Sequence, residues 1–199
     1  MEVSVFTPSE AFGSNTYVIE NSGVAAVIDP SVSYDEVIAH FETPPDFKYI
    51  IITHVHFDHM LEIDDWVKKT DADVIVGKED APAFRDSRIN CFKLFFDINK
   101  TYDGNYVTVE EGDKLSLGDL NIDIISTPGH TKGSVSLVTS DSIFVGDVIF
   151  SKYSVGRCDL PGGDYPTLLG SIKRILSYPD YIKVYPGHGN STTVSNIKN

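Results

Sequence analysis

The stretch ITHVHFDH, residues 52–59, places three of the chain's six histidines within six positions. It continues the apolar run KYIIIT (48–53), which predicts a buried strand. Alternate side chains of an extended backbone share a face, so the imidazoles of His54 and His56 can reach one ion. Asp58 and His59 follow where the chain turns into a predicted helix. Histidine is a common metal ligand at neutral pH, and four such side chains would crowd one small ion. The stretch therefore predicts a metal site with a second ion nearby.

Three further polar residues follow predicted strands in the second half of the chain. They lie in the sequences TPGH (127–130), FVGD (144–147) and YPGHG (185–189). Strand ends that converge at one edge of a sheet would bring these residues to the histidine stretch. We assign the first ion to His54, His56 and His130. We assign the second ion to Asp58, His59 and His188. Asp147 has two carboxylate oxygens and can bridge both ions.

The rest of the chain alternates between predicted strands and helices, which turn residues separate. Predicted strands cover residues 3–6, 16–20, 24–29, 48–53, 73–77, 120–126, 134–139, 142–147 and 181–187. Predicted helices cover 34–41, 61–69 and 165–176, and another begins at 78–84. Helices between groups of strands in both halves indicate sheets covered by helices. We see no linker, so we expect residues 1–199 to form one domain. Residues 86–105, rich in aromatic side chains, are a candidate lid or a packed loop.

The composition argues against nucleic acid and membranes as partners. The 199 residues carry a formal net charge of −13, and 41% of them are hydrophobic. An acidic surface repels phosphate backbones and anionic lipid, which argues against nucleic acid and membrane partners. We find no signal peptide and no apolar run of the ~18 residues that a membrane span needs. Two cysteines are too few for a disulfide framework. These features predict a cytoplasmic protein with a small-molecule substrate and leave the oligomeric state open.

Two metal ions held in this way favour hydrolysis. A pair of ions about 3.5–4 Å apart can hold a hydroxide between them and polarise the oxygen of the bond under attack. Asp58 and Asp147, which would hold and bridge the ions, are therefore the candidate catalytic residues. The ligand set offers only nitrogen and oxygen, which suits zinc, iron or manganese. Zinc is our first expectation, because hydrolysis needs no redox chemistry.

The combined motifs resemble those of the metallo-β-lactamase superfamily. The resemblance rests on residues 54–59, 127–130, 146–147 and 187–189, and it begins as early as Asn15-Thr16-Tyr17. It implies an α/β fold, a four-layer αββα sandwich, with the metal ions at one edge. Class B lactamases lack the adjacent Asp-His pair in this form, so β-lactams are not favoured. The nuclease branches carry RNA-gripping insertions, which the short length and acidic charge of this chain argue against.

The sequence GRCDLPGGDY (156–165) is similar to a loop of single-domain glyoxalase II-like proteins, the hydroxyacylglutathione hydrolase family. The implied reaction is hydrolysis of a thioester such as S-lactoylglutathione, whose thiol, with a pKa of about 8.5, leaves readily as thiolate. Two-domain members grip glutathione with a C-terminal helical domain, which we do not expect in the eleven residues after His188. Another acyl thioester therefore stays open. Candidate residues for an anionic substrate are Lys132, Lys152, Tyr153 and Arg157. An ion pair with Asp159 is the alternative role for Arg157.

Two other functions stay open. A persulfide dioxygenase of the same fold would hold one iron with His54, His130 and Asp147, although the sequence LPGG (160–163) favours the hydrolase branch. A metal-binding module without catalysis would turn over no thioester or phosphoester even when fully loaded. The metal count separates the two enzymes: two ions favour hydrolysis, and one iron with oxygen uptake favours the oxygenase.

Overall fold

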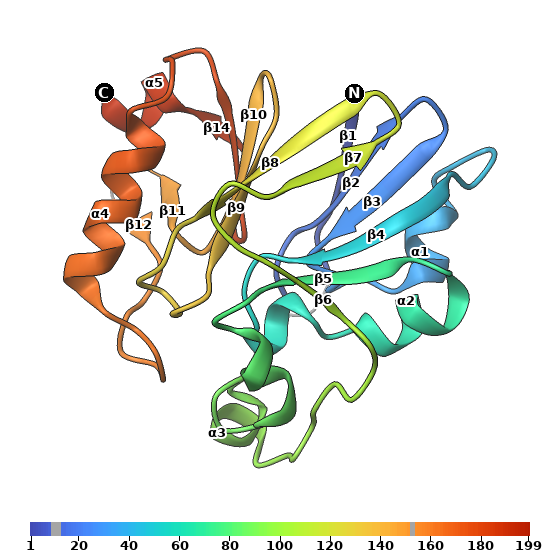
Figure 1. The fold of residues 1–199 in the computed structure, drawn as a ribbon, viewed down its shortest axis with the longest axis horizontal. Helices are drawn as coiled ribbons and strands as arrows, with labels where there is room; N and C mark the ends of the chain where they lie inside the picture. The colour runs from blue at the N-terminus through green and yellow to red at the C-terminus, as the bar shows by residue number, and fades with distance from the viewer. Residues whose placement is uncertain (9–12, 152–153) are drawn as a thin grey trace.

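The computed structural model describes residues 1–8, 13–151 and 154–199. Within them the chain forms two six-stranded sheets and a two-stranded ribbon (Figure 1). The first sheet has the order β1 (Glu2–Phe6), β2 (Thr16–Asn21), β3 (Val24–Ile28), β4 (Asp46–Ile52), β5 (Asp73–Gly77) and β6 (Val107–Val109). The second has the order β14 (Thr192–Thr193), β13 (Lys183–Pro186), β10 (Ser142–Gly146), β9 (Val135–Val138), β8 (Leu120–Ser126) and β7 (Lys114–Leu117). The ribbon pairs β11 (Ile149–Ser151) with β12 (Ser154–Val155).

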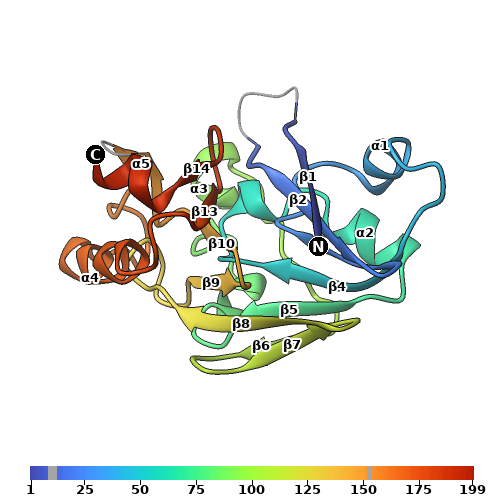
Figure 2. The same cartoon turned by 90° about the horizontal axis from the view of Figure 1, so that it is seen from above.

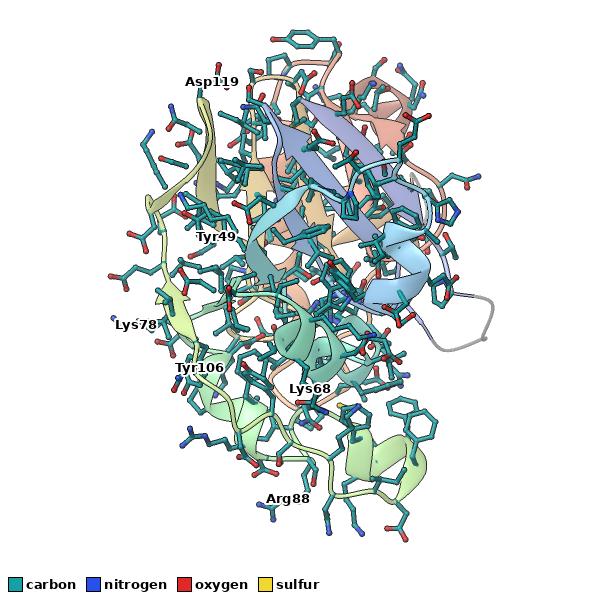
Figure 3. All side chains as sticks on the ribbon, turned by 90° about the vertical axis from the view of Figure 1, so that its right-hand side faces the viewer. Tyr49, Lys68, Lys78, Arg88, Tyr106 and Asp119 are labelled. Atoms are coloured by element: carbon teal, nitrogen blue, oxygen red, sulfur yellow. The ribbon has the colours of Figure 1, made fainter. Side chains whose placement is uncertain are left out.

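Helices cover the outer faces of both sheets. On the first sheet lie α1 (Tyr34–Ile38) and α2 (Ile63–Lys69), and on the second lie α4 (Tyr165–Leu176) and α5 (Val194–Lys198). Figure 2 shows α4 and α5 on one side of the strands and α1 and α2 on the other. In Figure 3, α1 and α2 lie in front of the first sheet. This arrangement confirms the expected αββα sandwich. No helix among the described residues is long and apolar enough to cross a membrane.

Three hydrophobic clusters explain the four layers. In β4, Ile50 and Ile52 pack toward α2 and its fully buried Trp66, whereas Ile51 packs between the sheets. In β10, Phe144 lies between the sheets and Ile143 packs toward α4. Alternate residues of a strand point to opposite faces, so a strand covered on both sides is apolar throughout. The continuous apolar runs in the sequence therefore mark the central strands of each sheet.

Among the predictions for individual strands and helices, one pair of strands is confirmed and one helix is wrong. The strands predicted at 16–20 and 24–29 are confirmed as β2 and β3. They form a hairpin in which Asn21 pairs with Val24, and the turn residues Ser22 and Gly23 have φ values of 58° and 81°. The helix predicted from residues 78–84 is wrong, because Ala81–Arg85 forms a 3-10 helix with a proline in its first turn. The segment 86–105 contains the short helix α3 (Phe92–Phe96).

The strand directions bring distant loops to one edge. Strands β3, β4 and β5 are parallel to one another, and β10 is parallel to β13. Strand β8 runs in the same direction as β10, because both are antiparallel to β9. Parallel strands present their carboxyl ends at the same edge of a sheet. The residues that follow β3 and β4 therefore lie at one edge of the first sheet, and those that follow β8, β10 and β13 lie at one edge of the second. The two edges adjoin, because His54 after β4 contacts His130 after β8.

Candidate metal centre

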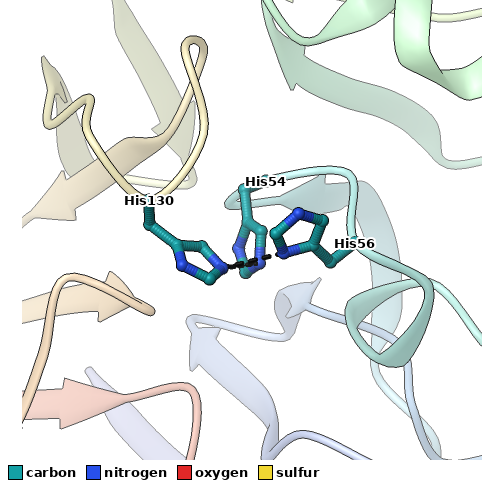
Figure 4. Close-up of side chains that lie close together, drawn as sticks. All are labelled: His54, His56 and His130. Atoms are coloured by element: carbon teal, nitrogen blue, oxygen red, sulfur yellow. Dashed lines mark hydrogen bonds between the residues drawn. The ribbon is translucent and has the colours of Figure 1, made fainter. Parts of the chain in front are cut away.

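Three histidine side chains from two loops converge at this edge (Figure 4). His54 and His56 follow β4, and His130 lies in the turn after β8. The Nε2 atom of His130 lies 3.1 Å from Nε2 of His54 and 2.8 Å from Nδ1 of His56. Nitrogens that bind one zinc ion at 2.0–2.1 Å in a tetrahedron lie roughly 3.3 Å apart. The observed spacing therefore fits nitrogens that share one ion.

A second group of side chains lies next to the first. The ligand-type atoms of Asp58, His59 and His188 lie within 4.8 Å of one another. Asp147 directly follows β10 and lies between the two groups. Its Oδ1 is 3.2 Å from Nε2 of His59, and its Oδ2 is 3.5 Å from Nε2 of His130 and 3.6 Å from Nε2 of His188. The structure thus brings together all seven side chains that the sequence singles out.

Two buried polar atoms at the centre of this group have no hydrogen-bond partner among the described residues. They are Nε2 of His59 and Oδ1 of Asp147, which lie 3.2 Å apart without the geometry of a hydrogen bond. A buried polar atom left unpaired costs about 1–3 kcal/mol, and a cation shared by both atoms would satisfy them. The donors around them are imidazole nitrogens and carboxylate oxygens, which suit divalent zinc, iron or manganese. The residues present therefore fit a divalent metal centre.

Oxygen atoms behind the cluster orient three of the imidazoles. The Nδ1 atoms of these histidines each meet an oxygen: His54 meets Thr53 Oγ1 at 3.2 Å, His59 meets Asp29 Oδ2 at 2.8 Å, and His130 meets the Arg157 carbonyl at 2.7 Å. A proton on Nδ1 that is donated to oxygen leaves the lone pair of Nε2 free for a metal. Asp29 also accepts from the Thr53 amide at 2.8 Å and from its hydroxyl at 2.7 Å. These contacts place Asp29 behind the metal loop, where it orients both the backbone at Thr53 and the ring of His59.

Asp29→Asn is expected to weaken metal binding by about 10–100-fold. An amide in place of the carboxylate offers only one acceptor oxygen to the donors of Thr53 and His59, so His59 loses its orientation. Competition with a chromophoric chelator measures the affinity. Asp35→Asn is the matched control, because Asp35 is 74% exposed and pairs with Lys69 on the surface. An unchanged affinity in Asp29→Asn would show that this carboxylate does not orient a ligand.

The electrostatic field of the cluster sets the protonation of each group. Burial first, and neighbouring imidazoles second, lower the pKa of His54 well below its usual range and that of His56 to about 3. Burial also disfavours charge on His59, but the carboxylates around it, led by Asp29, raise its pKa well above the usual range. Burial opposes ionisation of Asp147, yet His59 and a hydrogen bond with His188 hold the pKa of Asp147 well below its usual range. His54, His56 and Asp147 are therefore already in the protonation state that metal binding requires.

Asp80 ties two metal-site loops together, and the sequence analysis missed it. Its buried carboxylate accepts hydrogen bonds from the Thr131 hydroxyl at 2.7 Å, the Gly133 amide at 2.7 Å and the Val55 amide at 3.3 Å. These contacts hold the turn of His130 against the segment between His54 and His56. Residues 78–84 are predicted only to begin a helix, so the sequence carries no signal for this role of Asp80.

Asn15 fixes the loop of His188 in a similar way. Its side-chain amide donates to the carbonyls of Pro186 at 3.1 Å and Gly189 at 2.8 Å. Its backbone amide donates to the Gly187 carbonyl at 2.7 Å. Residues on both sides of His188 are thereby attached to the beginning of the first sheet. The sequence signal for this role was limited to the presence of Asn15 in the family resemblance.

A pocket of about 320 Å³ opens onto the cluster. It is lined by His56, Phe57, Asp58, Phe95, His130, Asp147, Phe150, Val155, Arg157, Leu160 and His188. Arg157 is therefore at the predicted place, but its guanidinium forms two 2.7 Å hydrogen bonds with Asp159, the alternative role. Lys132 is exposed and lines neighbouring depressions rather than this pocket. Lys152 and Tyr153 lie outside the described residues.

Comparison with known proteins gives a family model and relatives whose names describe hydrolases. The family described as "Metallo-beta-lactamase superfamily" matches residues 10–188. The probable metallo-hydrolase YqgX of Bacillus subtilis (strain 168) is 34% identical over 188 residues, which cover 91% of this chain and 87% of that protein. The hydroxyacylglutathione hydrolase GloC of Haemophilus influenzae is 30% identical over 207 residues, which cover 96% of this chain and 92% of that protein.

Solved structures extend the comparison to the fold. The B3 metallo-β-lactamase BLEG-1 has a TM-score of 0.89 at 29% identity, covering 98% of this chain and 95% of its own. A protein solved in a di-iron-bound form has a TM-score of 0.83 at 30% identity, covering 100% of this chain and 98% of its own. ETHE1 from Myxococcus xanthus has a TM-score of 0.78 at 25% identity, covering 100% of this chain and 82% of its own. The fold of this chain is thus similar to that of a B3 metallo-β-lactamase and to that of ETHE1.

Proposed function

The chain belongs to the metallo-β-lactamase superfamily and is a metal-dependent hydrolase, and on this basis we propose that it hydrolyses small-molecule acyl thioesters with two divalent metal ions. The observation that carries the proposal is the position of Asp147 between two groups of ligand-type side chains. The similarity to the hydroxyacylglutathione hydrolase GloC along nearly the whole chain supports thioesters as the substrate class. S-lactoylglutathione and related acyl thioesters are the first candidates.

Each residue has a defined part in this proposal. His54, His56 and His130 would hold one ion, Asp58, His59 and His188 would hold the other, and Asp147 would serve as a ligand to both. When bound, the two ions lower the pKa of a water molecule near the scissile bond and polarise the carbonyl oxygen. Asp29 and Asp80 keep the imidazoles in place, and the pocket positions the substrate. The leaving thiol has a pKa of about 8.5, so it departs as thiolate and needs no dedicated acid from the chain.

The metal identity is part of the proposal. Zinc is the first choice, because the nitrogen and oxygen donors suit it and hydrolysis needs no redox change. Iron is the second choice, since a relative with 30% identity was solved in a di-iron-bound form. Manganese also accepts this donor set.

A mononuclear-iron persulfide dioxygenase is the competing function. His54, His130 and Asp147 would form its triad, and Nε2 of His130 lies 3.1 Å from Nε2 of His54 and 3.5 Å from Oδ2 of Asp147. The same geometry thus accommodates a triad around one ion. The side chains of Asp58, His59 and His188 would then have no metal to hold, although their ligand-type atoms lie within 4.8 Å of one another.

The test is hydrolysis of S-lactoylglutathione by protein reconstituted separately with zinc, iron and manganese. We expect release of free thiol with at least one metal and no release by the metal-free protein. A chromogenic β-lactam and glutathione persulfide with oxygen-uptake detection are assayed in parallel. Absence of thioester turnover at full metal occupancy across several acyl groups would contradict the proposal. Oxygen uptake with iron would support the dioxygenase instead.

A further inference from the structure

One wall of the pocket is apolar, although the pocket opens onto a polar cluster. Its residues are Phe57, Phe95, Phe150, Val155 and Leu160, and we call them the apolar wall. Phe95 is 42% exposed and Val155 is 37% exposed. Rings of Phe57 and Phe95 lie 5.2 Å apart between centroids. Apolar side chains that gather in a pocket beside a few polar groups are typical of a ligand-binding surface.

The described lining of the pocket offers no unpaired lysine or arginine to a charged thiol carrier. Among the described lining residues, Arg157 is the only lysine or arginine. Its guanidinium is neutralised by Asp159 through two hydrogen bonds and lies 5.9 Å from the ring centroid of Phe95. The common thiol carriers are polar and charged, so contact with the apolar wall would contribute little to their binding free energy. An uncharged acyl chain, in contrast, would bind more tightly when it is buried against the apolar wall.

We propose that the apolar wall binds the acyl group of the substrate and that the preferred thioesters carry an apolar acyl chain of several carbons. This inference rests on the proposed thioester hydrolysis. The carbonyl must lie over the cluster of Asp58, Asp147 and His188, and the wall is the part of the same pocket next to it. The volume of about 320 Å³ corresponds to about ten water molecules at liquid density. That volume leaves room for several methylene groups beside the carbonyl.

The first experiment varies the chain length on one small thiol. Acetyl, butyryl, hexanoyl and octanoyl thioesters are compared with the lactoyl thioester in the metal-loaded protein. We expect kcat/KM to rise about fourfold for each added methylene until the wall is covered, the ratio that corresponds to about 0.8 kcal/mol per buried methylene. The lactoyl thioester, with a hydroxyl on a short chain, is expected to rank with the shortest acyl groups.

Three substitutions at two neighbouring positions of α3 test which side chain causes the dependence on chain length. Phe95→Ala removes part of the apolar wall and is expected to flatten the dependence on chain length, whereas Phe95→Leu retains most of it. Leu94→Ala is the matched control, because Leu94 is 59% exposed on α3 and does not line the pocket. Equal dependence on chain length in Phe95→Ala and Leu94→Ala would overturn the assignment of Phe95 to the wall.

A binding experiment separates this inference from the proposed function. The affinities of acetate, butyrate, hexanoate and octanoate for the metal-loaded protein are measured by calorimetry, which requires no turnover. If longer carboxylates bind more tightly and Phe95→Ala loses this trend, the apolar wall is supported even without thioester hydrolysis. Absence of hydrolysis in that case would contradict only the proposed function. Thioester turnover and carboxylate binding that are both independent of chain length would overturn the wall and leave thioester hydrolysis standing. Absence of both turnover and chain-dependent binding would overturn both.

Discussion

Asp147→Ala is expected to remove both metal ions and to lower hydrolysis by at least about 10³-fold. The carboxylate contributes one oxygen on the side of His59 and another on the side of His130 and His188. Alanine removes both contacts and leaves the buried imidazoles without an anion at their centre. A single group that stabilises charge in a transition state is worth about 10²–10³-fold, and loss of both ions removes more than one such group. Metal analysis and thioester turnover are measured on the same sample.

Asp58→Ala provides the comparison for Asp147→Ala. Asp58 contacts His188, with Oδ2 3.1 Å from Nε2 of His188, but it does not belong to the group of His54, His56 and His130. We expect this variant to retain one ion per chain and to lose hydrolysis. Thermal unfolding of both variants shows whether the fold is intact. Two ions retained in Asp147→Ala would show that this carboxylate is not the bridge, and full turnover in Asp58→Ala would contradict the two-metal scheme.

Gly187→Ala is expected to prevent metal binding while leaving the fold in place. A Cβ atom at this position would lie 2.6 Å from Cε1 of His59 and closer still to Oδ1 of Asp147. Both side chains would have to move out of the centre, since the backbone on either side is held by Asn15. We expect a loss of metal content and a fall in turnover of about 10²-fold or more, comparable to removal of one charge-stabilising group.

Gly170→Ala is the matched control for Gly187→Ala. Gly170 lies in α4, and a Cβ atom there would have no neighbour within 4 Å. Alanine at an unstrained helix position stabilises a protein by roughly 0.5–1 kcal/mol, so this variant should unfold at a slightly higher temperature with unchanged activity. Normal metal content and turnover in Gly187→Ala would show that Asp147 Oδ1 and His59 Nε2 do not face the metal.

The sequence carries most of the information about the layers and the ligand set. Alternation on extended backbone places His54 and His56 on one face, and apolar runs that end in Asp147 or lead to His188 mark the central strands. Parallel strands bring those ends to one edge of each sheet, and the packing of the two sheets against each other brings the two edges together. The predicted positions and the observed cluster agree for this physical reason.

Other features depend on contacts between distant segments and left no local pattern. Asp80 lies in a short polar stretch that is compatible with an exposed helix, and only its contacts with Thr131 and Gly133 reveal its place. Lys132 is two residues from His130 but lies outside the pocket. Phe95 enters the pocket from a segment with no strand or helix prediction. Substrate contacts are therefore less predictable from sequence than metal ligands.

Titration of the metal-free protein with zinc, with thioester turnover recorded at each addition, tests the central claim most directly. Two ions per chain and turnover that appears mainly with the second equivalent are the predicted results, because His54, His56 and His130 fill one position and Asp58, His59 and His188 complete the other. Repetition with iron under oxygen-uptake detection covers the competing reaction. Turnover that is complete at one equivalent, or two bound ions without any thioester turnover, would contradict the account.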